Sequence, residues 1–206
     1  MVSMEGFFYI FVWIMGVLIC LIVCILYKKK VFVSKYYWYL FWIGFGLGML
    51  WELPMSIANE LYICCGYPYP ASIFIIPTPI QGPLVVIVIA TTHSFWDGGF
   101  FLLSVLFLHL LCKEPYFEKF RWKELIVLIL VGQISELIVE LISTFSEGWV
   151  FFIGPGVWYN LILFQFNNKN ITLLPQLIWL AAPIVFYFIA LKLNFKIRKR
   201  RIPVPN

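Results

Sequence analysis

Five ionisable side chains lie within stretches of this 206-residue chain that are otherwise apolar enough for a lipid bilayer: Glu52, His93, Asp97, Glu136 and Glu140. A charged side chain at the centre of a bilayer costs at least ~2.5 kcal/mol, so such residues usually face a protein-lined cavity and carry function. A carboxylic acid that stays protonated in an apolar site can donate a proton to a weak base such as an alkene or an epoxide. The sequence therefore indicates acid–base chemistry inside a membrane.

The spacing of the polar residues predicts that they share helix faces. His93 and Asp97 are four positions apart, which places them one turn apart on the same side of a helix. The same reasoning groups Gln133 with Glu136 and Glu140, and Gln176 with Trp179. With a rise of 1.5 Å per residue, all these groups fall between the middle of the membrane and its outer interface. We therefore expect one polar pocket that opens toward the outer side.

Aromatic residues flank the polar set. A tryptophan face can stabilise a cation by up to about 2 kcal/mol in a desolvated site. We predict that the catalytic residues are Glu52, His93, Asp97 and Glu136, and that the substrate-binding residues are Trp51, Trp96, Gln133, Glu140, Gln176 and Trp179. An alternative remains open, in which His93 and Asp97 form a closed structural pair and the glutamates only link helices.

The composition predicts a membrane protein. Hydrophobic residues make up 63% of the chain, charged residues 12%, and the mean hydropathy is +0.93, whereas soluble domains contain roughly 45–50% apolar residues. Five stretches have the length of about 20 apolar residues that a membrane helix needs. We expect an all-α, single-domain bundle of five transmembrane helices, over residues 7–27, 36–57, 84–111, 125–145 and 172–193. The apolar stretch 149–166 is interrupted by glycine and proline, which indicates an interfacial loop or a re-entrant turn.

Charge and cysteine content limit the orientation and the partners. All of the 15 Lys and Arg residues except Lys169 map to one side of the predicted spans, which predicts an N-out, C-in protein with a basic cytoplasmic tail at 194–206. Basic residues next to a membrane indicate contacts with anionic lipids rather than with nucleic acid. The five cysteines form no metal-binding or disulfide pattern, and we expect no metal and no cofactor. On the outer side, the apolar segments 65–83 and 149–166 would act as interfacial anchors or as a lid.

Two short motifs resemble the EXPERA-domain family, which contains the emopamil-binding protein and the sterol Δ8–Δ7 isomerases. Val131-Gly132-Gln133-Ile134, followed by an acid, is similar to that family's fourth helix, and Gln176-Leu177-Ile178-Trp179 with Pro183 is similar to its Asn-x-x-Trp followed by proline. The helix count, the topology, the basic tail and the chain length are similar as well. The resemblance implies a sterol-binding pocket and an endoplasmic-reticulum membrane.

The chain also departs from the family pattern. The isomerases place a histidine one turn before a glutamate in the second helix, whereas here Glu52 matches the acid and Gly48 occupies the histidine position. His93 and Asp97 repeat this His-x-x-x-acid spacing in the third span, and Glu136 comes one residue earlier than the family's acid. A weaker resemblance links Trp51-Glu52 to integral-membrane terpene cyclases, which usually have seven spans.

The expected function is isomerisation of a sterol or another isoprenoid lipid by protonation and deprotonation through a carbocation. The alternatives are a non-catalytic lipid-binding protein of the same family and a membrane terpene cyclase. Proton-coupled transport would need polar residues that lead to the inner side, which the spans do not provide. The expected partners are an isoprenoid lipid and the membrane lipids, and a homodimer is left open.

The predicted orientation can be measured directly. A reporter fused after Asn206 should lie in the cytoplasm, and a cysteine introduced at Ser146 should react with an impermeant reagent added from outside, because the basic residues hold their side of the helices in the cytoplasm. An external C-terminus would contradict both the orientation and the placement of the polar pocket near the outer side.

Overall fold

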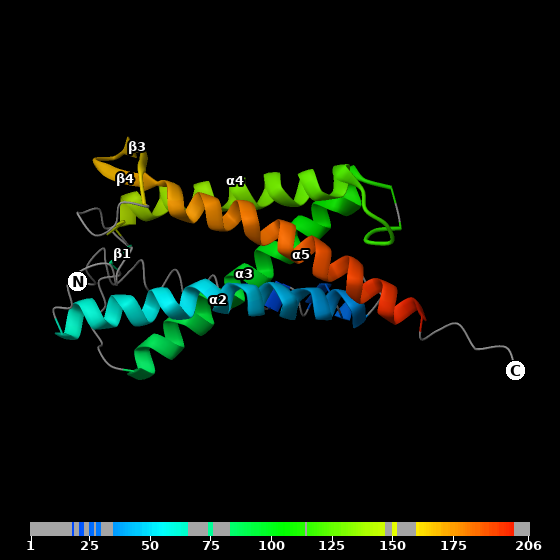
Figure 1. Ribbon diagram of the computed structural model, residues 1–206, viewed down its shortest axis with the longest axis horizontal. Helices are drawn as coiled ribbons and strands as arrows, with labels where there is room; N and C mark the ends of the chain where they lie inside the picture. The colour runs from blue at the N-terminus through cyan, green and yellow to red at the C-terminus, as the bar shows by residue number, and fades with distance from the viewer. Residues whose placement is uncertain are drawn as a thin grey trace, which may run out of the picture.

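Four long helices make up most of the computed structural model (Figure 1). The structure describes residues 35–65, 74–75, 83–113, 115–146, 150–151 and 160–199, together with isolated positions between 18 and 29. The helices are α2 (Lys35–Cys65), α3 (Pro83–Leu111), α4 (Trp122–Ser146) and α5 (Leu173–Lys199). The first predicted span, 7–27, lies mostly outside the described residues.

Each of these helices is long and apolar enough to cross a membrane. The spanning segments are Tyr36–Leu61, Val86–Leu111, Trp122–Thr144 and Leu173–Lys196. The chain is therefore an integral membrane protein that crosses the membrane several times, and the second to fifth predicted spans are confirmed as helices. α5 continues as a helix to Lys199, into the segment 194–206, whose role as a basic cytoplasmic tail stays a prediction.

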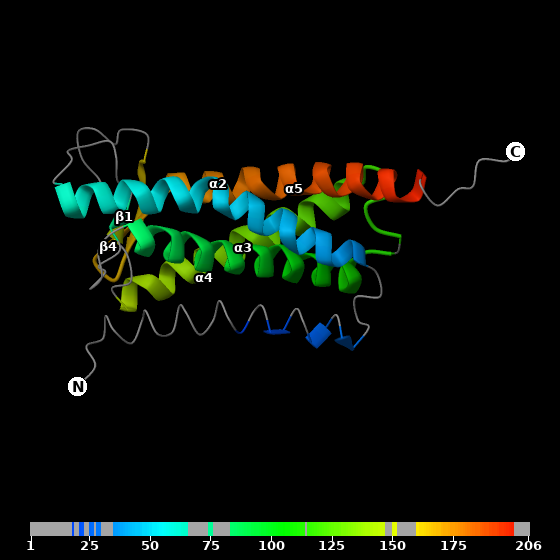
Figure 2. The same cartoon turned by 90° about the horizontal axis from the view of Figure 1, so that it is seen from below.

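The four helices all run between the same two ends of the molecule (Figures 1 and 2). α3 crosses α2 along the most extensive helix interface, and α4 packs against α5 and α3. The loop between α3 and α4 lies at the end where α5 finishes, and the short strands lie at the opposite end (Figure 1). This arrangement gives each spanning helix contact with at least one other.

Glycines allow α2 and α3 to approach closely. A Cβ atom at Gly44 would lie 3.1 Å from the Cα of Gly98, and a Cβ atom at Gly48 would overlap the carboxylate of Asp97. By contrast, Gly46 faces outward, and a Cβ atom there would have no neighbour within 4 Å. Small residues let helix backbones pack closely in membranes. Gly44 and Gly48 therefore let α2 pack closely on α3, whereas Gly46 points away from α3.

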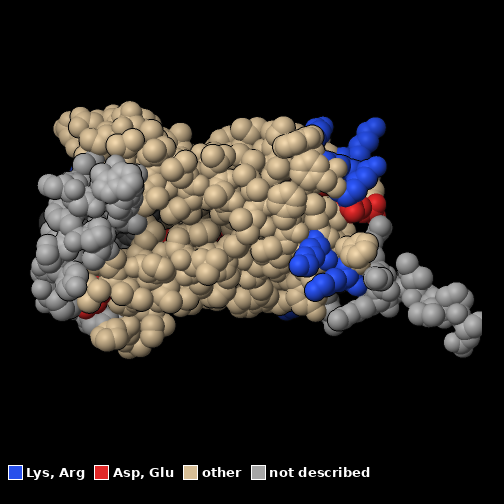
Figure 3. All heavy atoms as spheres, in the orientation of Figure 1, with Lys and Arg blue, Asp and Glu red and all other residues tan. Residues whose placement is uncertain are grey.

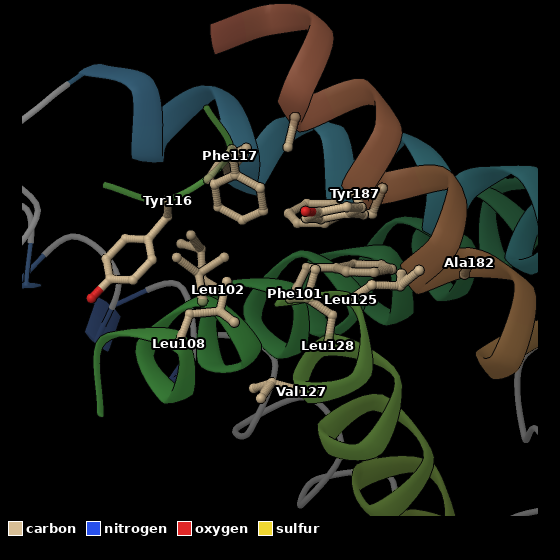
Figure 4. Close-up of a cluster of buried hydrophobic side chains, with 14 of the residues drawn as sticks. Phe101, Leu102, Leu108, Tyr116, Phe117, Leu125, Val127, Leu128, Ala182 and Tyr187 are labelled. Atoms are coloured by element: carbon tan, nitrogen blue, oxygen red, sulfur yellow. The ribbon is translucent and has the colours of Figure 1, made fainter. Parts of the chain in front are cut away.

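We call the part of the bundle that contains Glu52, His93, Asp97, Glu136 and Glu140 the polar region. A hydrophobic core fills the bundle between this region and the end at which α5 finishes (Figure 4). Phe101 on α3 stacks on Phe186 on α5 with ring centroids 4.5 Å apart. Both side chains are fully buried. Around them lie buried side chains from α2, α3, α4 and α5, including Leu40, Leu102, Val105, Leu108, Leu128, Ala182, Tyr187 and Ala190.

A buried carboxylate that the sequence analysis did not single out fixes the loop between α3 and α4. Glu124, in the first turn of α4, accepts hydrogen bonds from the backbone N–H of Phe117 at 3.2 Å and from the hydroxyl of Tyr187 at 3.1 Å. Its other oxygen lies 3.4 Å from Nη1 of Arg121. A negative charge is also favoured near a helix N-terminus. These contacts hold the loop against α5.

The segment predicted as an interfacial loop or re-entrant turn instead contains β-structure. Strand β3 (Ile162–Phe166) pairs antiparallel with β4 (Lys169–Thr172). Asn167 and Asn168 form the turn with φ values of 50° and 57°, a conformation that asparagine tolerates and that suits tight hairpins. The apolar run before the turn is rich in residues that favour strands. The all-α expectation therefore holds for the spanning segments only.

A second, shorter ladder joins the two segments that we expected to be apolar outer loops. Strand β1 (Phe74–Ile75) pairs antiparallel with β2 (Val150–Phe151). Most of the residues around both strands lie outside the described part of the chain. The pairing brings the two segments side by side, and whether they act as a lid or as anchors stays a prediction.

The glycine contacts predict a difference between two neighbouring substitutions on α2. Gly48→Ala should lower the free energy of unfolding by about 1–3 kcal/mol, because the added methyl group displaces the Asp97 side chain. Gly46→Ala should be neutral or stabilising by up to about 1 kcal/mol, because alanine favours the helix and meets no neighbour. Thermal unfolding of both variants in the same detergent provides the comparison. Equal destabilisation would contradict the close crossing at Gly48.

Candidate functional site

Two of the predicted catalytic residues are in direct contact. Nδ1 of His93 on α3 lies 2.9 Å from Oε2 of Glu52 on α2. The side chains are 16% and 14% exposed, respectively. One proton lies in this hydrogen bond, and either His93 or Glu52 can be the group that carries it. A pair of this kind, inside a spanning segment, is a candidate proton donor.

Asp97 lies one turn after His93 on α3 and adds a buried acid to the pair. Its side chain packs against the backbone of Gly48, and the residue is 5% exposed. Among the described residues, Oδ2 of Asp97 has no hydrogen-bond partner. A buried polar atom without a partner needs an explanation, and Asp97 also interacts electrostatically with Glu52 and Glu136. The carboxylate is therefore placed where a cation or a proton would be stabilised.

Hydrogen bonds donated by two glutamine side chains link α4 to α5 on the other side of the bundle. Nε2 of Gln133 donates to the backbone carbonyl of Gln176 at 2.9 Å, and Nε2 of Gln176 donates to Oε2 of Glu140 at 2.9 Å. Glu140 is fully buried, and its Oε1 has no hydrogen-bond partner in the described part of the chain. The bond to Glu140 fixes the orientation of the Gln176 amide, whose oxygen is then the end able to accept a hydrogen bond.

Glu136 connects the two sides of the polar region. It lies one turn before Glu140 on α4 and interacts electrostatically with both Glu140 and Glu52. Carboxylates from α2, α3 and α4 thus lie within electrostatic range of one another, as the helical spacing predicted. The only histidine beside them is His93, since the chain's other histidine, His109, packs against Tyr37 and Tyr116.

The three predicted aromatic residues belong to one connected cluster. The ring of Trp179 lies 6.0 Å from that of Trp51 and 5.9 Å from that of Phe100, both edge to face, and stacks on Phe101 at 5.7 Å. Trp96 contacts Phe100 at 6.0 Å. Trp179 therefore lies between the polar region and the hydrophobic core that begins at Phe101. Sequence reasoning missed Phe100 and Phe101, although Phe100 follows Trp96 by one helical turn.

Trp96 also carries an unused donor. Its Nε1 is buried without a hydrogen-bond partner among the described residues, and an indole N–H in a buried position usually has one. The neighbouring Asp97 has an unused acceptor. Adjacent residues on one helix thus present a donor and an acceptor that the described protein atoms leave unsatisfied.

The polar region lies away from the basic end of the molecule. Figure 3 shows Lys and Arg gathered at the end where α5 finishes, while the surface between the ends is almost entirely uncharged in this view. At the other end of the molecule, Glu140 lies within two turns of the C-terminus of α4, and Gln176 lies within two turns of the N-terminus of α5. No group of His, Cys, Asp and Glu suited to a metal ion occurs among the described residues. The arrangement instead offers proton donors, proton acceptors and aromatic faces.

No family model matches the chain, and no curated protein or solved structure matches it. The EXPERA resemblance therefore stays a prediction from short motifs. The function of the site has to be argued from its geometry.

The contact between Glu52 and His93 predicts an energetic coupling. In a double-mutant cycle, Glu52→Gln and His93→Ala should be non-additive by about 0.5–3 kcal/mol in the free energy of unfolding, because each single change already removes the shared hydrogen bond. The control combines His93→Ala with Glu124→Gln at the other end of the bundle, for which the effects should add within about 0.5 kcal/mol. Additive effects in both cycles would mean that the His93 and Glu52 side chains do not interact.

Proposed function

We propose that the protein is a membrane-embedded isomerase that moves a double bond in a sterol or another isoprenoid lipid. The observation that carries the proposal is the 2.9 Å contact between His93 and Glu52, because it supplies a transferable proton inside an apolar, membrane-spanning segment. Asp97 and Glu136 interact electrostatically with Glu52, and Trp51 precedes Glu52 on α2. An apolar substrate without charged groups needs this combination, since its only basic site is a carbon–carbon double bond.

We place this site in a five-helix protein whose N-terminus is outside and whose C-terminus is in the cytoplasm. The position of the Lys and Arg side chains at one end of the bundle (Figure 3) supports this orientation through the positive-inside rule. The polar region then lies in the outer half of the membrane. The compartment that fits the resemblance is the endoplasmic reticulum.

The EXPERA resemblance supports the same reaction through a rearranged pair. The family isomerases carry the histidine and the acid on one helix, whereas here Glu52 on α2 meets His93 on α3. The position that corresponds to the family histidine is Gly48, and the space beside it holds the carboxylate of Asp97. The chain thus retains both residue types next to each other, although two helices contribute them.

In the first step, the Glu52–His93 pair transfers its proton to one carbon of the double bond, and the π electrons form the new C–H bond. The neighbouring carbon becomes a carbocation. Trp179 and Trp51 offer aromatic faces to this cation, and whichever of Asp97 and Glu136 is ionised in this step offers it negative charge.

In the second step, a carboxylate accepts a proton from a carbon on the other side of the cation, and the C–H electrons form the new double bond. Asp97 or Glu136 takes this role, and a proton transfer back to the Glu52–His93 pair restores the starting state. Gln133 and Gln176 hold the network in place. The lipid changes only the position of its double bond, so no oxidant, reductant or cofactor is needed.

Proton-coupled transport fits less well than isomerisation. Between the polar region and the basic end, the described helices pack the apolar side chains of Phe101, Leu102, Val105 and Phe186. A proton would have to cross this packed segment (Figure 4). The site therefore suits chemistry on a molecule that enters from the membrane rather than movement of an ion across it.

A lipid-binding protein without catalysis is the second candidate. The hydrogen bonds among Gln133, Gln176 and Glu140 favour it, because they join α4 to α5 in the way that purely structural polar residues do. The same polar region would then bind an isoprenoid lipid without turnover. A membrane terpene cyclase would use the same acids and tryptophans to start a ring closure, and it shares the first chemical step.

Exchange of hydrogen with water separates catalysis from binding. Incubation of the protein with sterols and linear isoprenoids in heavy water should introduce deuterium into the recovered lipid, because the transferred proton comes from groups that exchange with the solvent. Glu52→Gln and His93→Ala should each lower the labelling rate by about 10²- to 10⁴-fold, the usual contribution of a general acid. Mass spectrometry of the lipid gives the rate.

Glu118→Gln, in the loop between α3 and α4, serves as the matched control and should label the lipid at the normal rate. If all of the lipids bind but emerge unlabelled and unchanged, the protein is a binder and not an isomerase.

A cationic amphiphile that resembles the carbocation should lose affinity in Glu52→Gln and His93→Ala. Unchanged affinity in both variants would make the pair a structural link only.

A further inference from the structure

The hairpin of β3 and β4 exposes a run of large apolar side chains. Leu161, Ile162, Leu163, Phe164 and Phe166 are between 37% and 59% exposed. Ile162 pairs with Thr172 and Phe164 pairs with Ile171 across a bulge, and the adjacent side chains of Thr172 and Ile171 point to opposite faces of the hairpin. Both faces of this strand therefore carry exposed apolar side chains.

This exposure does not come from a loosely held segment. Nδ2 of Asn167 in the turn donates to the carbonyl of Thr144 at the end of α4, at 3.0 Å. At the base, the N–H of Leu173 donates to the carbonyl of Leu161 at 2.8 Å, and the N–H of Leu174 donates to Oδ1 of Asn160 at 3.1 Å. The second strand is anchored as well, since Ile171 is fully buried. The hairpin is thus fastened to α4 and α5 while its first strand projects.

The hairpin is continuous with the surface that faces lipid. β4 ends at Thr172, and the spanning segment of α5 starts at the next residue, Leu173. Exposed apolar side chains continue along α5 at Leu177 and Leu180. In Figure 1 the two strands lie beside the ends of α4 and α5, so the hairpin begins where the hydrocarbon region ends.

The backbone of β3 limits how deep the hairpin can lie. Among the described strands, β3 pairs with β4 alone, so no described strand covers its other edge. Such an edge is unfavourable in hydrocarbon, where no water can satisfy it. At the boundary between headgroups and acyl chains, water and headgroups satisfy the edge while the side chains still contact lipid. The polar turn at Asn167 and Asn168 fits the same depth.

We propose that the β3–β4 hairpin inserts its apolar strand among the phospholipids at the membrane interface on the site's side of the bundle. Phospholipid fits this strand better than a second copy of the chain does. A copy that extended the sheet at the β3 edge would still leave exposed apolar side chains on the faces of the strand. Lipid surrounds both faces. This inference does not depend on the proposed isomerase activity.

The contact can be tested by photo-crosslinking in the membrane. The photoreactive amino acid benzoylphenylalanine replaces Phe164 in one variant of the full chain and Ile162, on the opposite face, in another. After illumination of intact membranes, both variants should gain the mass of one phospholipid. Leu130, which is 54% exposed in the middle of α4, provides the lipid-facing control.

Each other result would overturn the proposal. A covalent dimer as the main product would assign the strand to a second copy, and a product with a different protein would assign it to that partner. Absence of a lipid adduct at both hairpin positions, with the adduct present at Leu130, would place the strand in water. An adduct at only one of the two positions would rule out lipid on both faces. Unfolding temperatures equal to that of the unsubstituted chain show that the variants are folded.

Discussion

The close crossing of α2 and α3 is the constraint on which the polar site depends. Gly48 has no side chain, and the carboxylate of Asp97 occupies the adjacent space. Glu52 lies one turn after Gly48 on α2, and His93 lies one turn before Asp97 on α3. Because the two backbones approach so closely, these two side chains reach hydrogen-bonding distance. A larger residue at position 48 would move the helices apart and change the crossing. The acid–base pair is thus a consequence of backbone packing as much as of its own chemistry.

The bundle separates polar from apolar packing along its length. Near the hairpin end, buried Ser, Thr, Asn, Asp and Glu side chains lie between the helices, whereas the other half is filled mainly by aromatic and aliphatic side chains around Phe101 and Phe186, with Glu124 buried at its far end. Apolar packing around Phe101 and Phe186 offers few groups that could satisfy a charge. Trp179 stands at the boundary, since it stacks on Phe101 and touches Trp51. A lipid bound in the polar half would therefore contact aromatic rings on the side that faces the hydrophobic core.

Hydropathy and helical spacing were enough to predict the described spanning helices and the face that each polar residue occupies. They did not predict which residues meet across helices, because spacing fixes the side of a helix but not the rotation of one helix relative to another. The bond from Gln176 to Glu140 and the placement of Gly46 on the outer surface depend on that rotation. Glu124 was overlooked because an acid in the first turn of a helix is usually an exposed residue that stabilises the helix N-terminus, whereas here it is fully buried. The hairpin was missed because its apolar run resembles a short interfacial segment, and only the Asn167–Asn168 turn indicates a pair of strands.

The distribution of the site over several helices has a consequence for how it could work. When a histidine and its acid lie on one helix, their distance is set by helix geometry, whereas here it is set by the position of α3 against α2. A bound lipid that separated the two helices would lengthen the His93–Glu52 hydrogen bond and release the proton for transfer. The unsatisfied oxygen of Asp97 and the N–H of Trp96 lie on α3 next to this pair, so the same displacement would change their surroundings too. In the proposed isomerase, lipid binding and proton release would then be two results of one helix movement, with the glycine contact at Gly48 as its pivot.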